Sequence, residues 1–160
     1  YAFKVCRIVP ENNIEIILEA FSKTQYKLVI IGNWNNSQFG INIRKRFSGY
    51  SNLKLLDPIY DQQSLDELRS NCKLYIHGHS VGGTNPTLIE AISLKLPIIA
   101  FNCSFNKKVL GDSGLFFKNS KELLEMIKSE KFVDQNLNID FNLFKKDFIN
   151  EQYIELIKSP

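Results

Sequence analysis

Short, continuous apolar runs alternate with segments of helical periodicity along most of the chain. Within the runs, apolar and polar residues do not alternate as they do in a strand with one face in water, so we expect strands buried on both faces. Strands of this kind that are separated by helices form a parallel sheet. The sequence therefore predicts an α/β fold, a doubly wound parallel sheet of about six strands with helices on both faces. The expected strands are residues 2–8, 27–31, 53–56, 73–77, 97–101 and 115–117.

Helix signals fill most of the segments between these runs. The helix over residues 38–47 is expected to bury Ile41 and Phe47. The stretch from residue 102 to 110 is expected to be irregular. A last amphipathic helix is expected over 140–158, where phenylalanines recur at helical spacing. The expected N-caps of the other helices are Asn12 or Asn13, Ser64, Asn85 and Ser120.

Length and charge limit the class of protein. The chain of 160 residues, 44% of them hydrophobic, has room for a real core, and we take residues 1–160 as a single domain. A net charge of +3 is far from the concentrated basicity of a nucleic-acid binder, so we expect no nucleic-acid partner. The basic run Arg44-Lys45-Arg46 is interpreted as a solvated helix face rather than a phosphate or lipid contact.

Cysteine usage bears on the compartment. Cys6, Cys72 and Cys103 are far apart and odd in number, which is typical of reduced thiols in the cytosol. The sequence shows neither a signal peptide nor an apolar run of membrane-spanning length. It starts without Met, directly in a strand-like run, so we expect a further domain in front of it.

The stretch from Tyr75 to Ile92 carries the strongest functional signal. A strand ends at Gly78, a loop with two glycines follows, and Asn85-Pro86 opens a helix with an N-cap and a proline at its first position. The free N–H groups and the dipole of that first turn favour an anion such as phosphate. Glu90 lies one turn deeper on the same face, where a carboxylate needs a partner, and the two hydroxyls of a ribose would serve. This order of elements predicts a site for a nucleotide held by its diphosphate and its ribose.

Ligands of doubly wound sheets bind at the carboxyl ends of the strands, near the point where strand order reverses. The loops that begin there are the places where function is expected, and they start at Arg7, Gly32, Asp57, His77 and Phe101. His77 and His79 are interpreted as hydrogen-bonding side chains rather than a metal pair, because no third ligand has suitable spacing. We expect no metal and no cofactor.

Three blocks of the sequence together resemble one enzyme family. Residues 6–13, residues 29–32 and residues 77–92, the last with His-Gly-His-Ser-Val-Gly-Gly-Thr-Asn-Pro, are similar to the donor-binding C-terminal domain of family-four, GT-B-type retaining glycosyltransferases. The similarity runs from about residue 3 to about residue 127 in the right order and spacing. The histidine-containing version of the last block resembles the bacterial O-antigen and capsule branch. The resemblance implies a Rossmann-like sheet and a last helix that crosses back to a partner domain.

The resemblance also implies roles for particular residues. Arg7 matches the arginine that grips the donor diphosphate, and Glu90 matches the second glutamate of the family's pair, which holds the ribose hydroxyls. We take these two as the residues on which catalysis depends. Their alternatives are a surface ion pair of Arg7 with Glu11, and a structural carboxylate at Glu90 that caps a neighbouring loop. The expected donor-binding residues are Arg7, Asn12, Gly32, Ile59, His79, Gly82, Gly83, Thr84, Asn85 and Glu90.

Two positions depart from the family's pattern. The first glutamate of the pair falls on Gly82, and the lysine that accompanies the arginine falls on Asn12. The diphosphate is then less neutralised than in the usual pattern, unless Lys107 or Lys108 approaches it. Either the donor differs from the family norm, or backbone groups and His79 take over.

The resemblance implies transfer of a hexosyl-type sugar from a UDP-type donor to a lipid-linked saccharide during O-antigen or capsule synthesis. The acceptor would be bound by the missing N-terminal domain, so the present chain is expected to bind donor and transfer nothing. The implied place is the cytoplasm, at the inner face of the plasma membrane, with peripheral membrane contact. Two alternatives stay open: a non-catalytic nucleotide-binding module and a GT-B-type nucleotide-sugar epimerase.

Overall fold

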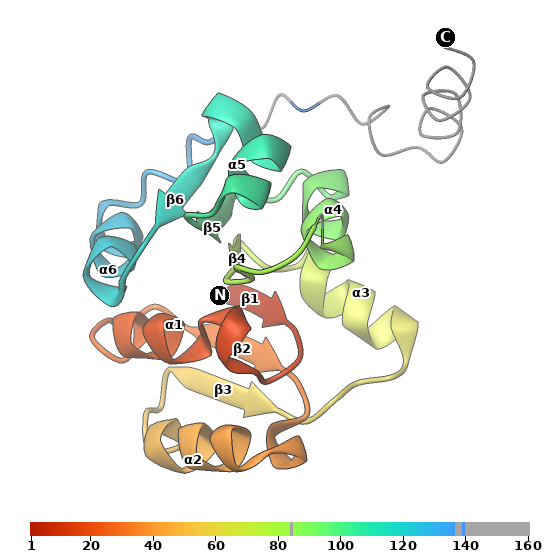
Figure 1. Cartoon of the computed structure of the whole chain (residues 1–160), viewed down its shortest axis with the longest axis vertical. Coiled ribbons are helices and arrows are strands. Elements are labelled where there is room, and N and C mark those ends of the chain that lie inside the picture. The colour runs from red at the N-terminus through yellow and green to blue at the C-terminus, as the bar shows by residue number, and fades with distance from the viewer. Residues whose placement is uncertain (84, 137–138, 140–160) are drawn as a thin grey trace, which may run out of the picture.

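Six parallel strands form one sheet in the order β3-β2-β1-β4-β5-β6 (Figure 1). The structure is a computed structural model, and it describes residues 1–83, 85–136 and 139. The doubly wound parallel sheet expected from the sequence is confirmed. The strands are β1 (Ala2–Val5), β2 (Leu28–Ile31), β3 (Leu53–Leu56), β4 (Leu74–His77), β5 (Ile98–Phe101) and β6 (Leu115–Phe117).

Helices cover both faces of this sheet, with α1, α2 and α6 on one side and α3, α4 and α5 on the other. Successive residues of a strand point to opposite faces, and each face has its own core cluster. Along β1, Ala2 belongs to the cluster under α1 and Phe3 to the cluster under α4. The helices are α1 (Ile14–Phe21), α2 (Gln38–Phe47), α3 (Gln62–Ser70), α4 (Pro86–Ser93), α5 (Ser104–Leu110) and α6 (Ser120–Ser129).

Several boundaries differ from those expected. The first strand ends at Val5 rather than Ile8, because Pro10 opens a 3₁₀ turn (Pro10–Asn12) that leads into α1. The stretch expected to be irregular contains α5, a helix of seven residues without a side-chain N-cap. The sequence therefore lacks the two usual signals of a helix here, a long apolar periodicity and a capping side chain. In α2 the side chain buried beside Phe47 is Ile43, and Ile41 is exposed.

Two of the expected N-caps are also wrong. Asp61, not Ser64, caps α3, and its side chain accepts a hydrogen bond from the Ser64 N–H. Asn119, not Ser120, caps α6 by accepting from the Glu122 N–H. In both helices the observed cap lies earlier in the chain than the expected one.

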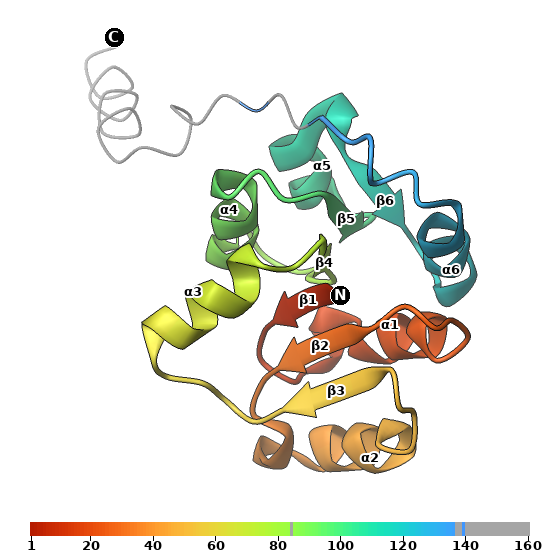
Figure 2. The same cartoon turned by 180° about the vertical axis from the view of Figure 1, so that it is seen from behind.

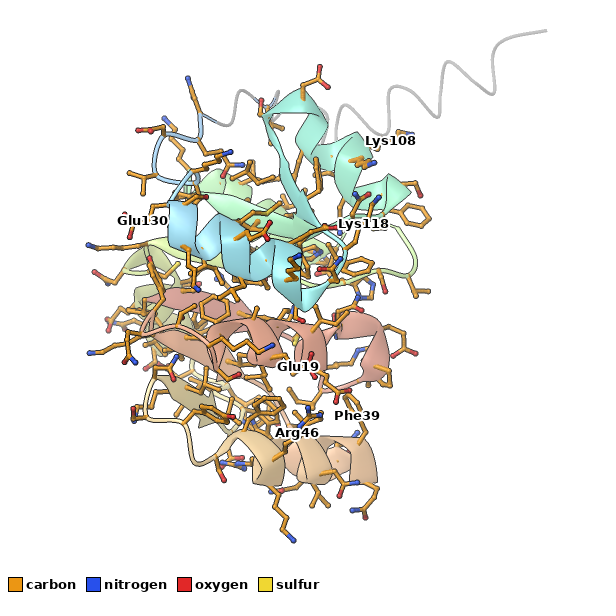
Figure 3. The ribbon with its side chains drawn as sticks, turned by 90° about the vertical axis from the view of Figure 1, so that its left-hand side faces the viewer. Glu19, Phe39, Arg46, Lys108, Lys118 and Glu130 are labelled. Atoms are coloured by element: carbon orange, nitrogen blue, oxygen red, sulfur yellow. The ribbon has the colours of Figure 1, made fainter. Side chains whose placement is uncertain are left out.

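The basic run on α2 is largely engaged with neighbouring carboxylates. Arg44 pairs with Asp57, and Arg46 pairs with Glu15 and Glu19 of α1. Figure 3 shows Arg46 and Glu19 facing each other between the two helices. These contacts agree with the interpretation of the run as a helix face.

The reversal of strand order lies between β1 and β4, the two central strands. The chain runs from β1 outward to β3, and then returns past β1 to continue from β4 to β6. The arrows of β1, β2 and β3 point to the same side of the molecule, toward α3 (Figure 2). The loops that leave β1 and β4 therefore start side by side at the carboxyl edge of the sheet and lead to helices on opposite faces. This edge is where such folds bind ligands.

The helix expected over 140–158 lies outside the described residues. Within the part of the chain that is described, no helix has both the length and the apolar composition needed to cross a membrane.

Candidate functional site

The loop after β1 brings Arg7 to the carboxyl edge of the sheet. Its shape is set by Asn12, which is buried and donates from Nδ2 to the Arg7 carbonyl oxygen at 2.7 Å. The Arg7 side chain is exposed, and the structure gives it no ion pair with any described carboxylate. The alternative pairing with Glu11 is therefore not observed. An unpaired guanidinium at a ligand-binding edge is free to take a phosphate.

The loop after β4 leads into the N-terminus of α4. The Asn85 Oδ1 atom accepts from the Thr87 N–H at 3.0 Å and from the Thr87 hydroxyl at 2.8 Å, so Asn85 is the N-cap that the sequence predicted. Pro86 follows at the first helical position. The free N–H groups expected in this turn are not found: Pro86 has none, the Thr87 N–H is bound by the Asn85 side chain, and the Leu88 N–H donates to the Asn85 carbonyl oxygen. What the turn offers an anion is the positive end of the helix dipole, beside the hollow that Arg7 also lines.

The two loops lie against each other. The Asn13 side chain donates to the Gly78 carbonyl oxygen at 2.8 Å, and the Ser80 N–H donates to the Glu11 carbonyl oxygen at 3.0 Å. Gly78 is required for this approach, because a Cβ at that position would clash with the Asn12 carbonyl oxygen. Residues far apart in sequence thus form one rigid edge.

The network defines the proton position on His79. The Asn12 Nδ2 atom is a donor to Arg7, so Asn12 Oδ1 is an acceptor, and the His79 Nδ1 atom at 3.1 Å must carry the hydrogen. Burial first, and then the Lys4 ammonium, lower the pKa of His79. The ring is therefore neutral at pH 7, with Nε2 as an acceptor. It adds no cation to the site.

His77 lies at the end of β4 and is 1% exposed. Neither ring nitrogen has a hydrogen-bond partner among the described residues. Burial, followed by the positive charge of Lys4, lowers the pKa of His77 well below its usual value. A buried polar group without a partner is uncommon and calls for an explanation.

Three hollows meet at Arg7. The first, of about 440 Å³, is lined by Arg7, Glu11, His79, Gly82, Gly83 and Asn85, among others. The second, of about 190 Å³, lies deeper and is lined by Arg7, Asn12, His77, His79, Asn85 and Thr87, together with Val5 and Cys6. The third, of about 470 Å³, brings Gly32, Ile59 and Tyr60 beside Arg7. Most of the expected donor-binding residues are therefore gathered around Arg7, while Thr84 lies outside the described residues.

Glu90 lies apart from these hollows. It lines a cleft of about 790 Å³ between α3 and α4, and its Oε2 atom is 2.7 Å from Nη2 of Arg69. The contact is an ion pair whose geometry falls short of a hydrogen bond. Arg69, whose side chain is 4% exposed, also binds Asp66 at 2.6 Å. The partner required by a carboxylate on this helix is thus a protein side chain, although half of the carboxylate's capacity stays open.

Sequence reasoning missed three features of this edge. Arg69 carries no motif signal and is recognised only when α3 packs beside α4. Lys4 reads as part of an apolar strand, yet its ammonium is buried beneath the site and its pKa is lowered by that burial. His77 is expected from the sequence to form hydrogen bonds, and this expectation is wrong for the described chain, where neither ring nitrogen has a partner. Within the described chain, no cluster of three His, Cys, Asp or Glu residues suited to a metal ion is present.

The chain resembles known proteins in sequence and in structure. Residues 1–134 match the family model described as Glycosyl transferases group 1. No curated protein matches the chain in sequence. The solved structures that resemble the chain are 16% or 17% identical to it, so their likeness shows a shared fold.

Three solved structures illustrate this likeness. HepE from Anabaena in complex with UDP-glucose has a TM-score of 0.74 and 16% identity, over 99% of this chain and 48% of HepE. The C-terminal domain of the group 1 protein LpcC from Francisella tularensis has a TM-score of 0.69 and 16% identity, over 96% of this chain and 86% of that domain. TarM from S. aureus has a TM-score of 0.72 and 17% identity, over 99% and 35%. The chain thus spans about half the length of HepE.

Proposed function

Because the chain belongs to group 1 of the glycosyl transferases, we propose that it forms the nucleotide-sugar-binding half of a retaining, GT-B-type glycosyltransferase of family four. The observation that carries the proposal is the position of Arg7. The Arg7 guanidinium, which has no ion pair among the described residues, and the capped N-terminus of α4 face the same hollows at the reversal of strand order. That combination suits a diphosphate.

The proposed mechanism is electrostatic. As the bond between sugar and diphosphate loosens, negative charge builds on the leaving group, and the Arg7 guanidinium and the positive end of the α4 dipole stabilise it. The backbone that carries these groups is fixed before reaction, since Asn12 holds the Arg7 carbonyl oxygen and Asn85 caps the helix. The acceptor hydroxyl attacks from the front face, assisted by the leaving phosphate, and no metal or cofactor takes part.

The proposed donor is a UDP-type sugar nucleotide. HepE was solved with UDP-glucose, and with UDP and glucose, which supports this class of donor for a domain of the same fold. The hollow that contains Ile59 and Tyr60 is the proposed site of the base, beside the diphosphate at Arg7. Glu90 clasps the ribose from the cleft between α3 and α4, beside its ion pair with Arg69.

The acceptor is proposed to be a lipid-linked saccharide of O-antigen or capsule synthesis, bound outside this domain at the inner face of the cytoplasmic membrane. Hexosyl transfer would then require both halves of the enzyme. The present chain is expected to bind donor without turning it over.

Calorimetric titration with UDP, GDP and dTDP tests the proposal. We expect the wild-type chain to bind UDP with the highest affinity, and Arg7→Ala to weaken that binding by about tenfold or more, as the loss of a charge-assisted hydrogen bond predicts. Arg46→Ala is the matched control, because Arg46 is an exposed arginine paired with α1. Binding of UDP that Arg7→Ala leaves unchanged would contradict the site, and no binding of any nucleotide would contradict the function.

A further inference from the structure

His77 is the most unusual side chain at the carboxyl edge of the sheet. It is almost fully buried, and both of its ring nitrogens lack partners within the described chain. A neutral imidazole always carries one N–H, and burying that donor without an acceptor destabilises the protein. Such a group is retained at a functional site when its acceptor arrives with a ligand.

The surroundings of His77 indicate the chemistry of that ligand. The ring lines the deep pocket of about 190 Å³, far more than the roughly 30 Å³ that one water occupies in the liquid. Arg7 lines the same pocket, and Asn85 and Thr87 bring to it the first turn of α4. No carboxylate among the described residues lines it. A cation would be repelled by the Arg7 guanidinium, whereas a phosphoryl group would be attracted to it and could accept a hydrogen bond from the His77 ring.

Building on the function proposed above, we propose that this pocket takes the distal phosphoryl group of the nucleoside diphosphate, and that His77 donates its ring N–H to a phosphoryl oxygen once the ligand displaces the atoms that cover the ring nitrogens in the unliganded chain. The lowered pKa of His77 agrees with this role, because the ring then acts as a neutral donor. The donor stands on β4, a rigid central strand, and its ring stacks on Tyr75 with centroids 6.2 Å apart. His77 thus supplies, without charge, part of what the family's lysine would supply at the position of Asn12.

A ladder of ligands that differ in phosphate content tests the assignment. Binding of UMP, UDP and inorganic pyrophosphate is measured by calorimetry on the wild type, on His77→Phe and on His77→Gln. We expect His77→Phe to lower the affinity for UDP and for pyrophosphate by about tenfold, since one hydrogen bond to the distal phosphate is lost. The affinity for UMP should stay within about twofold of the wild-type value. His77→Gln keeps an N–H donor and should recover part of the affinity.

Thermal unfolding of the unliganded variants separates binding from a structural role. His77→Phe should unfold at the wild-type temperature or higher, because an unpartnered polar group has been removed. Tyr75→Phe is the matched control: it removes a buried hydroxyl under α4 and should leave the affinities for UMP, UDP and pyrophosphate unchanged. His77→Leu gives the same readout in a smaller side chain if phenylalanine does not fit.

The outcomes are distinct. Equal losses for UMP and UDP, or no loss for either, would overturn the role of His77 and leave the proposed function standing. If the wild type binds pyrophosphate but no nucleoside diphosphate, the phosphoryl pocket stands and the nucleotide part of the proposed function falls. If it binds neither, both are overturned.

Discussion

At the scale of single residues, Glu90 and Arg69 show how packing can complete an incomplete sequence signal. A glutamate among apolar residues of a helix requires a partner, and that requirement was visible in the sequence. The identity of the partner was not, because Arg69 lies 21 positions earlier, on a helix whose packing against α4 is a tertiary feature. The ribose proposed for Glu90 would share the carboxylate with Arg69 rather than replace it.

The first prediction concerns the ribose. Glu90→Ala should lower the affinity for UDP by about tenfold and the affinity for 2′-deoxy-UDP by much less, because the deoxy ligand already lacks one of the two hydroxyls. It should also lower the free energy of unfolding by roughly 1–3 kcal/mol, since Arg69 stays buried with Asp66 as its remaining partner. Calorimetry and urea unfolding measure the two effects.

Glu67→Ala is the matched control for Glu90, because Glu67 lies on α3 and lines the same cleft. It should change neither quantity appreciably. Equal losses of affinity for UDP and for 2′-deoxy-UDP in Glu90→Ala would show that the carboxylate does not bind the ribose hydroxyls.

The second prediction concerns pH. Burial, the Lys4 ammonium and His79 lower the pKa of His77 well below 6.5, so below about pH 6.5 the unfolded chain binds a proton that the folded chain excludes. The free energy of unfolding should therefore fall as the pH drops from 7 to 5. His77→Phe should flatten this fall without abolishing it, because the pKa of His79 is lowered too. Chemical unfolding at several pH values measures the slope, and equal slopes in both proteins would contradict the assignment.

At the scale of elements, α4 has two roles that most helices of this chain do not share. Its N-terminus has to be stable, and the positive end of its dipole has to face the anion. The sequence identified α4 correctly, since Asn85 and Pro86 are adjacent and strong signals. It misplaced the caps of α3 and α6, where Asp61 lies three residues before the expected Ser64 and Asn119 lies directly before the expected Ser120. It missed α5, which is too short to show periodicity.

The third prediction separates the two roles of α4. Asn85→Ala and Asn119→Ala each remove a side-chain N-cap, so each should cost about 1 kcal/mol of stability. Of the two, Asn85→Ala should also weaken UDP binding, because the N-terminus of α4, unlike that of α6, lines the hollow beside Arg7. Thermal unfolding and calorimetry on the pair provide the comparison. A loss of UDP affinity in both variants would mean that the effect is a general consequence of stability.

At the scale of the whole molecule, the order of strands places the site. The alternation of apolar runs and helices was sufficient to predict a doubly wound parallel sheet, and the carboxyl edges of β1 and β4 follow from that topology. The sequence could not predict that this edge contains a pocket beside His77. The pocket beside His77 is lined by residues of the β1 and β4 loops, which Gly78 allows to approach closely.

A crystal structure of the chain with UDP bound tests the central claim most directly. The diphosphate should lie between the Arg7 guanidinium and the first turn of α4, with donor-to-oxygen distances of about 2.7–3.1 Å. The distal phosphate should reach the pocket beside His77. A nucleotide bound elsewhere on the molecule, with Arg7 and the α4 N-terminus untouched, would contradict the account.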